Sequence, residues 1–515
     1  MQKAVKGSFL NLFGNVLFRI GGYIQIVLLT YLLGVSGYGI VRLVMPLQNV
    51  LILIAAAGIP PAVAKYVAEY HAKNDNYMVK RVIKTSAKIM LLMSIIATLL
   101  IIFLVNPLAP ILHWQQNIII LFQIIALITP FSIILGLVRG VFQGYQDMGN
   151  ILLTRAFEQF FTIISAVGLI LLGWYVFGAV IGTIMGFAIA AVISLVLFRE
   201  RIWKNIGDDR KTSDPISERS LVKKLLTFSL PVTVVGLAEL ALFDMTGTYI
   251  INIFLNVTYT GYYNIVSPVA RIPLVISSSV ALAMLPAASE ASSLKDTNLI
   301  GKYIVYSYRY MILILIPLCI IIALFSQPIL SVLFPKAPLT YLFAGNALSI
   351  LIVAMAFFSI YVVSSSIAQG LGKPYLPMFF LIMGSIVNIV LTIIFVPLYG
   401  LNGAAAATAT ATFLIMVFTT WKVLRINNTK LPYTNLVKIL FASLLAGLAV
   451  ELLPKTVIGL LIALLLFSFI YVFILAVSGA LEKRDLILLN RLGYKLGPLS
   501  GYFMKISKLL EKFVR

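Results

Sequence analysis

Charged side chains occur inside stretches of this chain that are otherwise apolar. Three of them are arginines: Arg19, Arg42 and Arg271. An ionisable group is costly in a bilayer and therefore usually faces protein or a water-filled cavity. Arginine presents a planar fork of N–H donors that matches the oxygens of a phosphate or a carboxylate. The three arginines therefore favour a cavity that binds an anionic substrate.

Asparagines accompany the arginines on the same helical faces, counted at about 100° per residue. They are Asn15, Asn49 and Asn264. Such a polar face indicates either the wall of a lumen or a polar seam between packed helices. A deep position favours the lumen for Arg19 and Arg271. Arg42 lies near the end of its stretch, where an interfacial, snorkelling position explains it equally well. We predict all six side chains as substrate-binding candidates.

Two acids, Asp244 and Glu239, lie in the apolar stretch at about 225–254. On an ideal helix their side chains point about 140° apart. One interpretation is coupling, in which a carboxylate takes up a proton or a sodium ion during transport. The other is that an acid neutralises an arginine, which for Asp244 means Arg271 or Arg19. The sequence leaves both interpretations open.

The elements that must position these side chains are apolar stretches, each long enough to cross a bilayer as a helix. The chain is 61% hydrophobic and only 11% charged, which is about half the charge of an average soluble domain. We predict an all-α polytopic membrane protein with fourteen transmembrane helices. The predicted spans are about 8–33, 40–64, 82–105, 118–142, 151–173, 176–198, 225–254, 262–287, 303–326, 340–368, 375–396, 401–421, 435–453 and 457–480.

Lysine and arginine are distributed unequally between the connecting segments. One side receives nearly all of them, Arg309 included, whereas the other side receives only Lys336 and Lys455. Because basic loops stay in the cytoplasm, we predict a multi-pass protein of the cell membrane with both termini cytoplasmic. The same distribution explains the net charge of +22 without a nucleic-acid partner.

The chain repeats itself at a spacing of about 225 residues. The row Gly178, Gly182, Gly186 returns as Gly403, Ala407, Ala411. Small residues at this spacing allow close helix packing. We therefore predict two parallel six-helix bundles, in an N-lobe at 1–222 and a C-lobe at 223–430. Two extra helices follow at 431–480, and an amphipathic, basic cytoplasmic tail at 481–515.

The sequence offers no constellation for catalysis. His71 and His113 have no neighbouring Cys, His, Asp or Glu at the spacing of a metal site. Phosphate-binding glycine loops and nucleophile elbows are missing as well. Glu158 follows Arg155 by one helical turn, and we expect a local ion pair between them. We expect no enzymatic activity, cofactor or metal.

Residues 31–70 (YLLGVSGYGIVRLVMPLQNVLILIAAAGIPPAVAKYVAEY) resemble the polysaccharide-transporter branch of the multidrug/oligosaccharidyl-lipid/polysaccharide (MOP) exporter superfamily. The turns Gln143-Gly144-Tyr145 and Gln369-Gly370-Leu371-Gly372-Lys373-Pro374 are similar to the same branch, which includes Wzx-like oligosaccharide flippases and sporulation stage V protein B-like members. The resemblance implies two bundles around a central cavity and an alternating-access cycle. It also implies that Arg19, Arg42 and Arg271 coincide with cavity arginines on spans 1, 2 and 8 of lipid II flippases.

Our leading hypothesis is a flippase that moves a polyprenyl-(di)phosphate-linked oligosaccharide from the inner to the outer leaflet. The expected partners are the lipid-linked glycan, membrane lipids, and glycosyltransferases or a polymerase of the same pathway, and we expect a monomer. The alternatives are a cation-coupled multidrug antiporter of the same superfamily and a lipid II flippase. A membrane scaffold for cell-wall enzymes also fits the composition.

Overall fold

The computed structural model describes residues 2–110, 114, 116–207, 217–294, 296–335, 338–481 and 485, with the side chains of 2–17, 19, 108 and 338–341 excepted. Every regular element in these ranges is a helix, so the all-α prediction is confirmed for them. The predicted tail at 481–515 lies outside the described residues, apart from residues 481 and 485.

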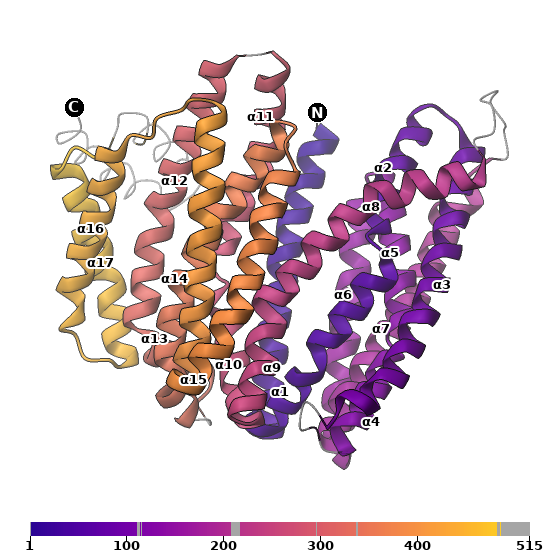
Figure 1. Cartoon of the computed structure of the whole chain (residues 1–515), viewed down its shortest axis with the longest axis horizontal. Helices are drawn as coiled ribbons and strands as arrows, with labels where there is room; N and C mark the ends of the chain where they lie inside the picture. The colour runs from indigo at the N-terminus through magenta and orange to yellow at the C-terminus, as the bar shows by residue number, and fades with distance from the viewer. Residues whose placement is uncertain are drawn as a thin grey trace, which may run out of the picture. The chain divides into compact units, whose positions relative to one another are not determined.

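The helices fall into two compact units (Figure 1). Unit 1 comprises Met1–Pro268 and Leu381–Thr408, and unit 2 comprises Val269–Phe380 and Ala409–Arg515. The lobe boundaries expected from the repeat stay a prediction. Unit 1 contains α1 (Gln2–Ala56), α2 (Ile59–Ala72), α3 (Asn76–Leu108), α4 (Gln116–Ala126), α5 (Thr129–Gly144), α6 (Met148–Leu169), η1 (Ile170–Trp174), α7 (Tyr175–Arg201), η2 (Trp203–Asn205), α8 (Glu218–Leu240), η3 (Ala241–Met245), α9 (Thr246–Phe254) and most of α10 (Val257–Ala270).

Unit 2 contains α11 (Leu274–Ser293), α12 (Thr297–Leu324), α13 (Ser326–Leu333), α14 (Pro338–Gly370), α16 (Tyr433–Glu451) and α17 (Val457–Val477). The long helix α15 (Tyr375–Ile426) contributes to both units. α16 and α17, which correspond to the two predicted extra spans, pack on α12 through a core that includes Ala446, Ala463 and Phe467.

Eleven helices in the described part are long and apolar enough to cross a membrane. Three of these segments are 53, 58 and 52 residues long. At 1.5 Å per residue, about 50 residues span roughly 75 Å, more than twice the hydrocarbon core of a bilayer. Each contains a glycine with non-helical backbone angles: Gly34, Gly173 or Gly400. Two crossings per long segment agree with the predicted spans, while the total of fourteen stays a prediction.

At Gly173 the chain reverses, and the glycine row of α7 packs against α6. A Cβ added at Gly182 would meet the backbone of Ala166, and one added at Gly186 would meet the backbone of Thr162. The predicted close helix approach is therefore confirmed for this pair. In Figure 1 the chain likewise descends from the N-terminus along α1 and returns to α2, which is drawn at the same upper end as the N-terminus.

Two predicted spans are interrupted. The second breaks at Ala57 and Gly58, which have φ of 46° and 62° and separate α1 from α2. The eighth breaks at Arg271, between α10 and α11. Pro268 and Pro273 flank the break at Arg271. Proline interrupts a helix because it lacks a backbone N–H and its ring clashes with the preceding turn.

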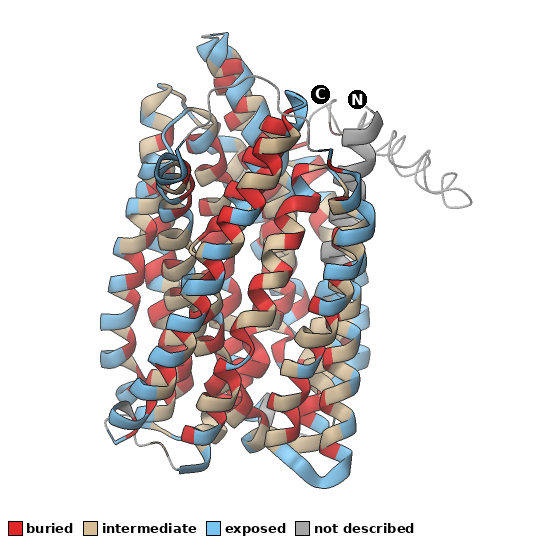
Figure 2. Cartoon of the chain, turned by 90° about the vertical axis from the view of Figure 1, so that its right-hand side faces the viewer, coloured by how far each residue is buried: buried red, intermediate tan, exposed pale blue. Residues whose placement is uncertain are grey.

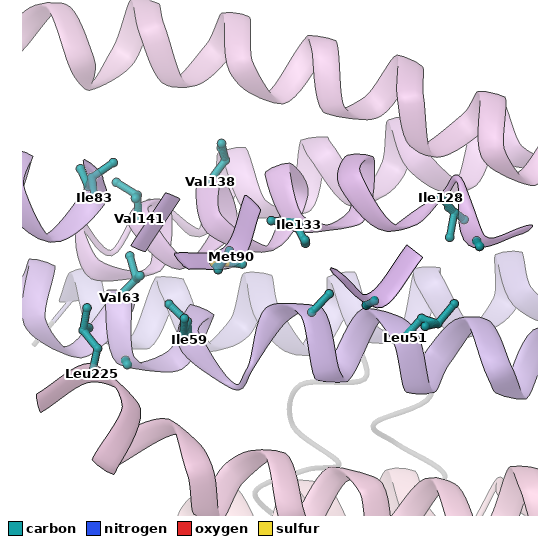
Figure 3. Packing of buried hydrophobic residues seen from close by; sticks show 14 of the residues in the cluster. Leu51, Ile59, Val63, Ile83, Met90, Ile128, Ile133, Val138, Val141 and Leu225 are labelled. Carbon is teal, nitrogen blue, oxygen red and sulfur yellow. The ribbon is translucent and has the colours of Figure 1, made fainter. Parts of the chain in front are cut away.

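The core of unit 1 is a continuous apolar cluster between α1, α2, α3, α5 and α8. Figure 3 shows Val63, Ile83, Val141 and Leu225 from four of these helices close together. Burial is one-sided along most helices, with buried and exposed segments alternating in Figure 2. The exposed faces are themselves apolar, for example Leu171 and Leu172 at 71% and 75% exposure, as expected for surfaces that contact lipid.

Candidate functional site

Arg42 lies in the part of α1 that follows the Gly34 kink, and it faces a cavity of about 330 Å³ within unit 1. The cavity lies between α1, α6 and α7. Its lining is Phe18, Gly22, Gln25, Ile26, Leu29, Tyr38, Val41, Arg42, Met45, Gln48, Asn49, Glu158, Gln159, Thr162, Thr183 and Phe187. We call this space the Arg42 cavity.

The guanidinium of Arg42 is held by polar neighbours. Its Nε donates to Asn264 Oδ1 at 3.2 Å, and its Nη2 lies 3.9 Å from Asp244 Oδ1. Asn264 is fixed in turn, because its Nδ2 donates to Thr248 Oγ1 and to the carbonyl oxygen of Thr260, each at 3.0 Å. These bonds orient the arginine without burying it, and 23% of its side chain stays exposed.

Two glycines allow this arrangement. A Cβ added at Gly39 would meet the carbonyl oxygen of Val257, and one added at Gly261 would meet that of Val35. α1 and α10 therefore approach backbone to backbone, which brings Asn264 within reach of Arg42. Gly261 belongs to a Gly-Tyr pair that repeats Gly37-Tyr38 in the first half of the sequence.

Three buried polar atoms in the cavity lining have no hydrogen-bond partner among the described residues. They are the Tyr38 hydroxyl, Gln48 Oε1 and Thr162 Oγ1, and the three residues are at most 5% exposed. Buried polar groups in proteins are almost always hydrogen-bonded. The cavity is therefore suited to a polar occupant rich in donors and acceptors, such as water or a hydroxylated ligand.

A second ion pair reaches the cavity through Glu158. Its Oε2 accepts from Arg139 Nη2 at 2.6 Å, and Arg139 Nε donates to Thr154 at 3.1 Å. The expected local partner Arg155 also interacts electrostatically with Glu158, so Glu158 lies beside two arginines. Helical spacing predicts partners one turn away, whereas Arg139 lies 19 residues earlier on α5. Gln25 and Gln159 add a bond of 3.1 Å between α1 and α6.

The predicted site residues divide as follows. Unit 1 brings together Arg42, Asn264 and Asp244, while Asn49 lines the cavity. The sequence predicts Asn264 on the helical face of Arg271, and it suggests Arg271 or Arg19 as the partner of Asp244. It does not predict the contacts that both residues make with Arg42. Arg271 belongs to unit 2.

The structure gives less detail for three further candidates. Arg19 and Asn15 belong to α1, but their side chains lie outside the described residues. Glu239 is exposed in the last turn of α8. The π-helical segment η3 follows it and carries Asp244, so the ideal-helix angle between the two acids does not apply.

The sequence reasoning missed several lining residues, among them the three with unpartnered buried atoms in the described structure: Tyr38, Gln48 and Thr162. They are uncharged, and no charge in an apolar stretch marks them. The one available signal was their distribution, since Gln48 adjoins Asn49 and Tyr38 lies one helical turn before Arg42.

Comparison with known proteins gives two family matches and a shared fold. The family model for "Polysaccharide biosynthesis protein" matches residues 4–292, and MatE matches residues 231–394. The Lipid II flippase MurJ of Bacillus subtilis (strain 168) is 24% identical over 442 residues, covering 79% of this chain and 80% of that protein.

Two of the similar solved structures each cover most of this chain. "Lipid II flippase MurJ, inward closed conformation" has a TM-score of 0.73 at 18% identity and covers 94% of this chain and 100% of that one. An inward-facing multidrug resistance MATE family transporter of the MOP superfamily has a TM-score of 0.69 at 15% identity, covering 80% and 96%.

Proposed function

Because the chain belongs to the polysaccharide biosynthesis protein family of the MOP superfamily, we propose that it is a flippase for a lipid-linked oligosaccharide. It moves a polyprenyl-(di)phosphate-linked glycan from the inner to the outer leaflet by alternating access. The observation that carries this proposal is the composition of the Arg42 cavity. It combines an oriented guanidinium with three buried polar groups that have no partner among the described residues.

Arg42 binds the phosphate of the substrate in this proposal. Its Nε is engaged by Asn264 and its Nη2 lies 3.9 Å from Asp244, so the proposal assigns Nη1 and the second N–H of Nη2 to the ligand. Two parallel bonds from a guanidinium to phosphate oxygens are strong and directional. The cavity of about 330 Å³ lies at the small end of ligand pockets, which suits a headgroup more than a whole glycan.

The buried polar groups of the lining suit the hydroxyls of a sugar. Gln48 Oε1 needs a donor, while the hydroxyls of Tyr38 and Thr162 can donate or accept. A saccharide hydroxyl does both. We extend the proposal to Arg19, Arg271, Asn15 and Asn49 as further substrate contacts, and we place both termini in the cytoplasm. Lysine and arginine distribution supports that orientation.

A second candidate is a cation-coupled multidrug antiporter, favoured by the MatE match to residues 231–394. Such a protein needs an acid that is available to an organic cation or a coupling ion. Asp244 lies 3.9 Å from Arg42, and Glu158 is bonded to Arg139. Both acids are thus next to arginines, which supports the flippase over the antiporter. Efflux of organic cations by cells that express this chain would favour the antiporter.

The test is glycan flipping by Arg42 variants in vesicles. Arg42→Ala should reduce the exposure of a fluorescent polyprenyl-diphosphate-linked saccharide at the far leaflet at least tenfold, since one charged hydrogen bond is worth more than about 1.4 kcal/mol. Arg42→Lys should recover only part of the rate, because lysine lacks the fork. The control is Lys204→Ala, which removes an exposed cation that pairs with Glu200. Normal flipping by well-folded Arg42→Ala would contradict the assignment. A lipid II substrate run in parallel distinguishes the lipid II flippase.

A further inference from the structure

Two lysines from different helices of unit 1 stack on one buried aromatic ring. Lys65 Nζ lies 5.2 Å from the centre of the Tyr66 ring, and Lys224 Nζ lies 4.7 Å from it. Lys65 also lies 4.6 Å from the centre of Phe228, and Lys224 lies 5.7 Å from that of Tyr70. We call these five residues the lysine–aromatic cluster. It joins α2, which carries the first lysine, to α8, which carries the second.

The cluster is held in place by its aromatic floor. Tyr66 and Tyr70 are 4% and 6% exposed, and the rings of Tyr66 and Phe228 meet edge to face at 6.4 Å. Below them α2 and α8 pack closely, because a Cβ at Gly58 would meet the carbonyl oxygen of Ser229. An ammonium group over a ring face gains cation–π attraction. Each of the two ammonium groups therefore gains attraction from an aromatic ring, which an isolated lysine in water lacks.

Positive charge exceeds negative charge around the cluster. Glu69 is the acid one turn from Lys65, and its Oε1 binds Lys73 Nζ at 2.9 Å. Three ammonium groups therefore share one carboxylate among these described residues. Lysine is a point-charge donor to phosphate, and each ammonium group stacked on a ring keeps N–H donors directed away from that ring. The cluster is chemically suited to an anion with several oxygens.

We propose that the lysine–aromatic cluster binds the phosphate group of a lipid in the cytoplasmic leaflet, as a site separate from the Arg42 cavity. None of its five residues belongs to the described lining of that cavity. The ligand is either the (di)phosphate of the glycan carrier or the phosphate of a bulk anionic lipid. The first source rests on the proposed function, and in that case the cluster captures the substrate before transport.

The chain contains a matched control for this site. Lys80 and Lys84 both stack on Trp203, at 5.8 Å and 5.9 Å from the ring centre. They also belong to unit 1 and lie in the same basic region of the sequence. Changing either pair of lysines to glutamine removes the same charge and the same kind of contact. A difference between the two double variants therefore reports the site and not the overall charge.

The experiment measures binding by the full chain in nanodiscs of neutral phosphatidylcholine. Three probes are titrated separately: a polyprenyl-diphosphate-linked saccharide, phosphatidylglycerol and inorganic pyrophosphate. Lys65→Gln with Lys224→Gln should weaken lipid binding about tenfold, and the loss should shrink at high salt. Lys80→Gln with Lys84→Gln should change it little. Tyr66→Leu keeps both charges and should give a smaller loss, which covers the case in which the double variant folds poorly.

The outcomes distinguish the glycan carrier from a bulk anionic lipid as the source of the phosphate. They also distinguish failure of the lysine–aromatic cluster proposal from failure of the flippase proposal. A loss for the saccharide lipid alone identifies the carrier as the ligand, and an equal loss for phosphatidylglycerol identifies a general lipid-phosphate site. A loss for pyrophosphate alone, equal losses in the control pair, or no loss at all would overturn the proposal. Transport is not needed for this readout. Failure here leaves the Arg42 flipping test untouched, and failure of that test leaves the binding result standing.

Discussion

At the scale of single residues, the Arg42 cavity depends on contacts between positions that lie far apart in the sequence, such as Arg42 with Asn264 and Glu158 with Arg139. Arg42 could be selected from the sequence because a charge in an apolar stretch is unusual. Its bond to Asn264 joins positions 222 residues apart, and helical periodicity contains no information about such a contact. Glu158 shows the same limit, since helical spacing predicts its interaction with Arg155 but not its hydrogen bond to Arg139, 19 residues away on another helix.

The Arg139–Glu158 ion pair leads to a prediction about stability. Its side chains are only 20% and 10% exposed, so Glu158→Leu leaves a guanidinium without its carboxylate and should cost about 3 kcal/mol. Arg139→Met combined with Glu158→Leu should recover part of that loss, because the Arg139 guanidinium is removed together with its carboxylate, while Arg155 still loses the nearby charge of Glu158. Thermal unfolding of the purified protein measures both.

The exposed pair Lys204–Glu200 provides the control for this prediction. Glu200→Gln removes a contact of 2.7 Å between two groups that are more than half exposed, and it should leave the unfolding temperature unchanged. Equal stability of Glu158→Leu and the native protein would show that the buried pair is dispensable.

At the scale of helices, small residues were more informative than hydropathy. The glycine row of α7 predicted close helix packing, which the structure shows with α6, and two prolines flank the break in span 8 at Arg271. The break at Ala57 and Gly58 was not predicted. Pro60 and Pro61 follow it, but proline is also tolerated in the first turn of a helix, so the sequence did not distinguish a break from a continuous span.

The α6–α7 contact can be tested with two glycines of the same hairpin. Gly186→Leu should destabilise the protein by about 1–3 kcal/mol, since its side chain meets the backbone of Thr162. Gly168→Leu places the same side chain on α6 where no atom lies within 4 Å, and it should be tolerated. Melting curves in detergent compare the two, and an equal effect would contradict the packing argument.

At the scale of the whole molecule, the repeat and the charge distribution predicted a duplicated membrane protein. Eleven helices in the described part are long and apolar enough to cross a membrane, while the duplication stays a prediction. The ion pair between Arg309 and Asp485 was not predicted. Arg309 was assigned to a cytoplasmic segment, and in the structure it lies on α12 with only 1% of its surface exposed. It donates to both carboxylate oxygens of Asp485 and to the carbonyl oxygen of Ala480. Asp485, which follows α17 in the sequence, is therefore bound to α12 within unit 2.

Truncation tests this closure. A chain that ends after residue 480 leaves Arg309 buried without Asp485, and its stability should fall by about 3–5 kcal/mol. A chain that ends after residue 490 keeps the pair and should melt near the full-length protein. If both truncated chains melt alike, the ion pair does not anchor the end of unit 2.

The glycine turns have a practical consequence for mapping topology. Gly34, Gly173 and Gly400 connect long helical segments with almost no loop between them. These turns therefore expose little extended backbone that a protease could cleave or an antibody could bind. Labelling of single introduced cysteines suits this chain better, because its one native thiol, Cys319, is buried and stays silent toward a membrane-impermeant maleimide.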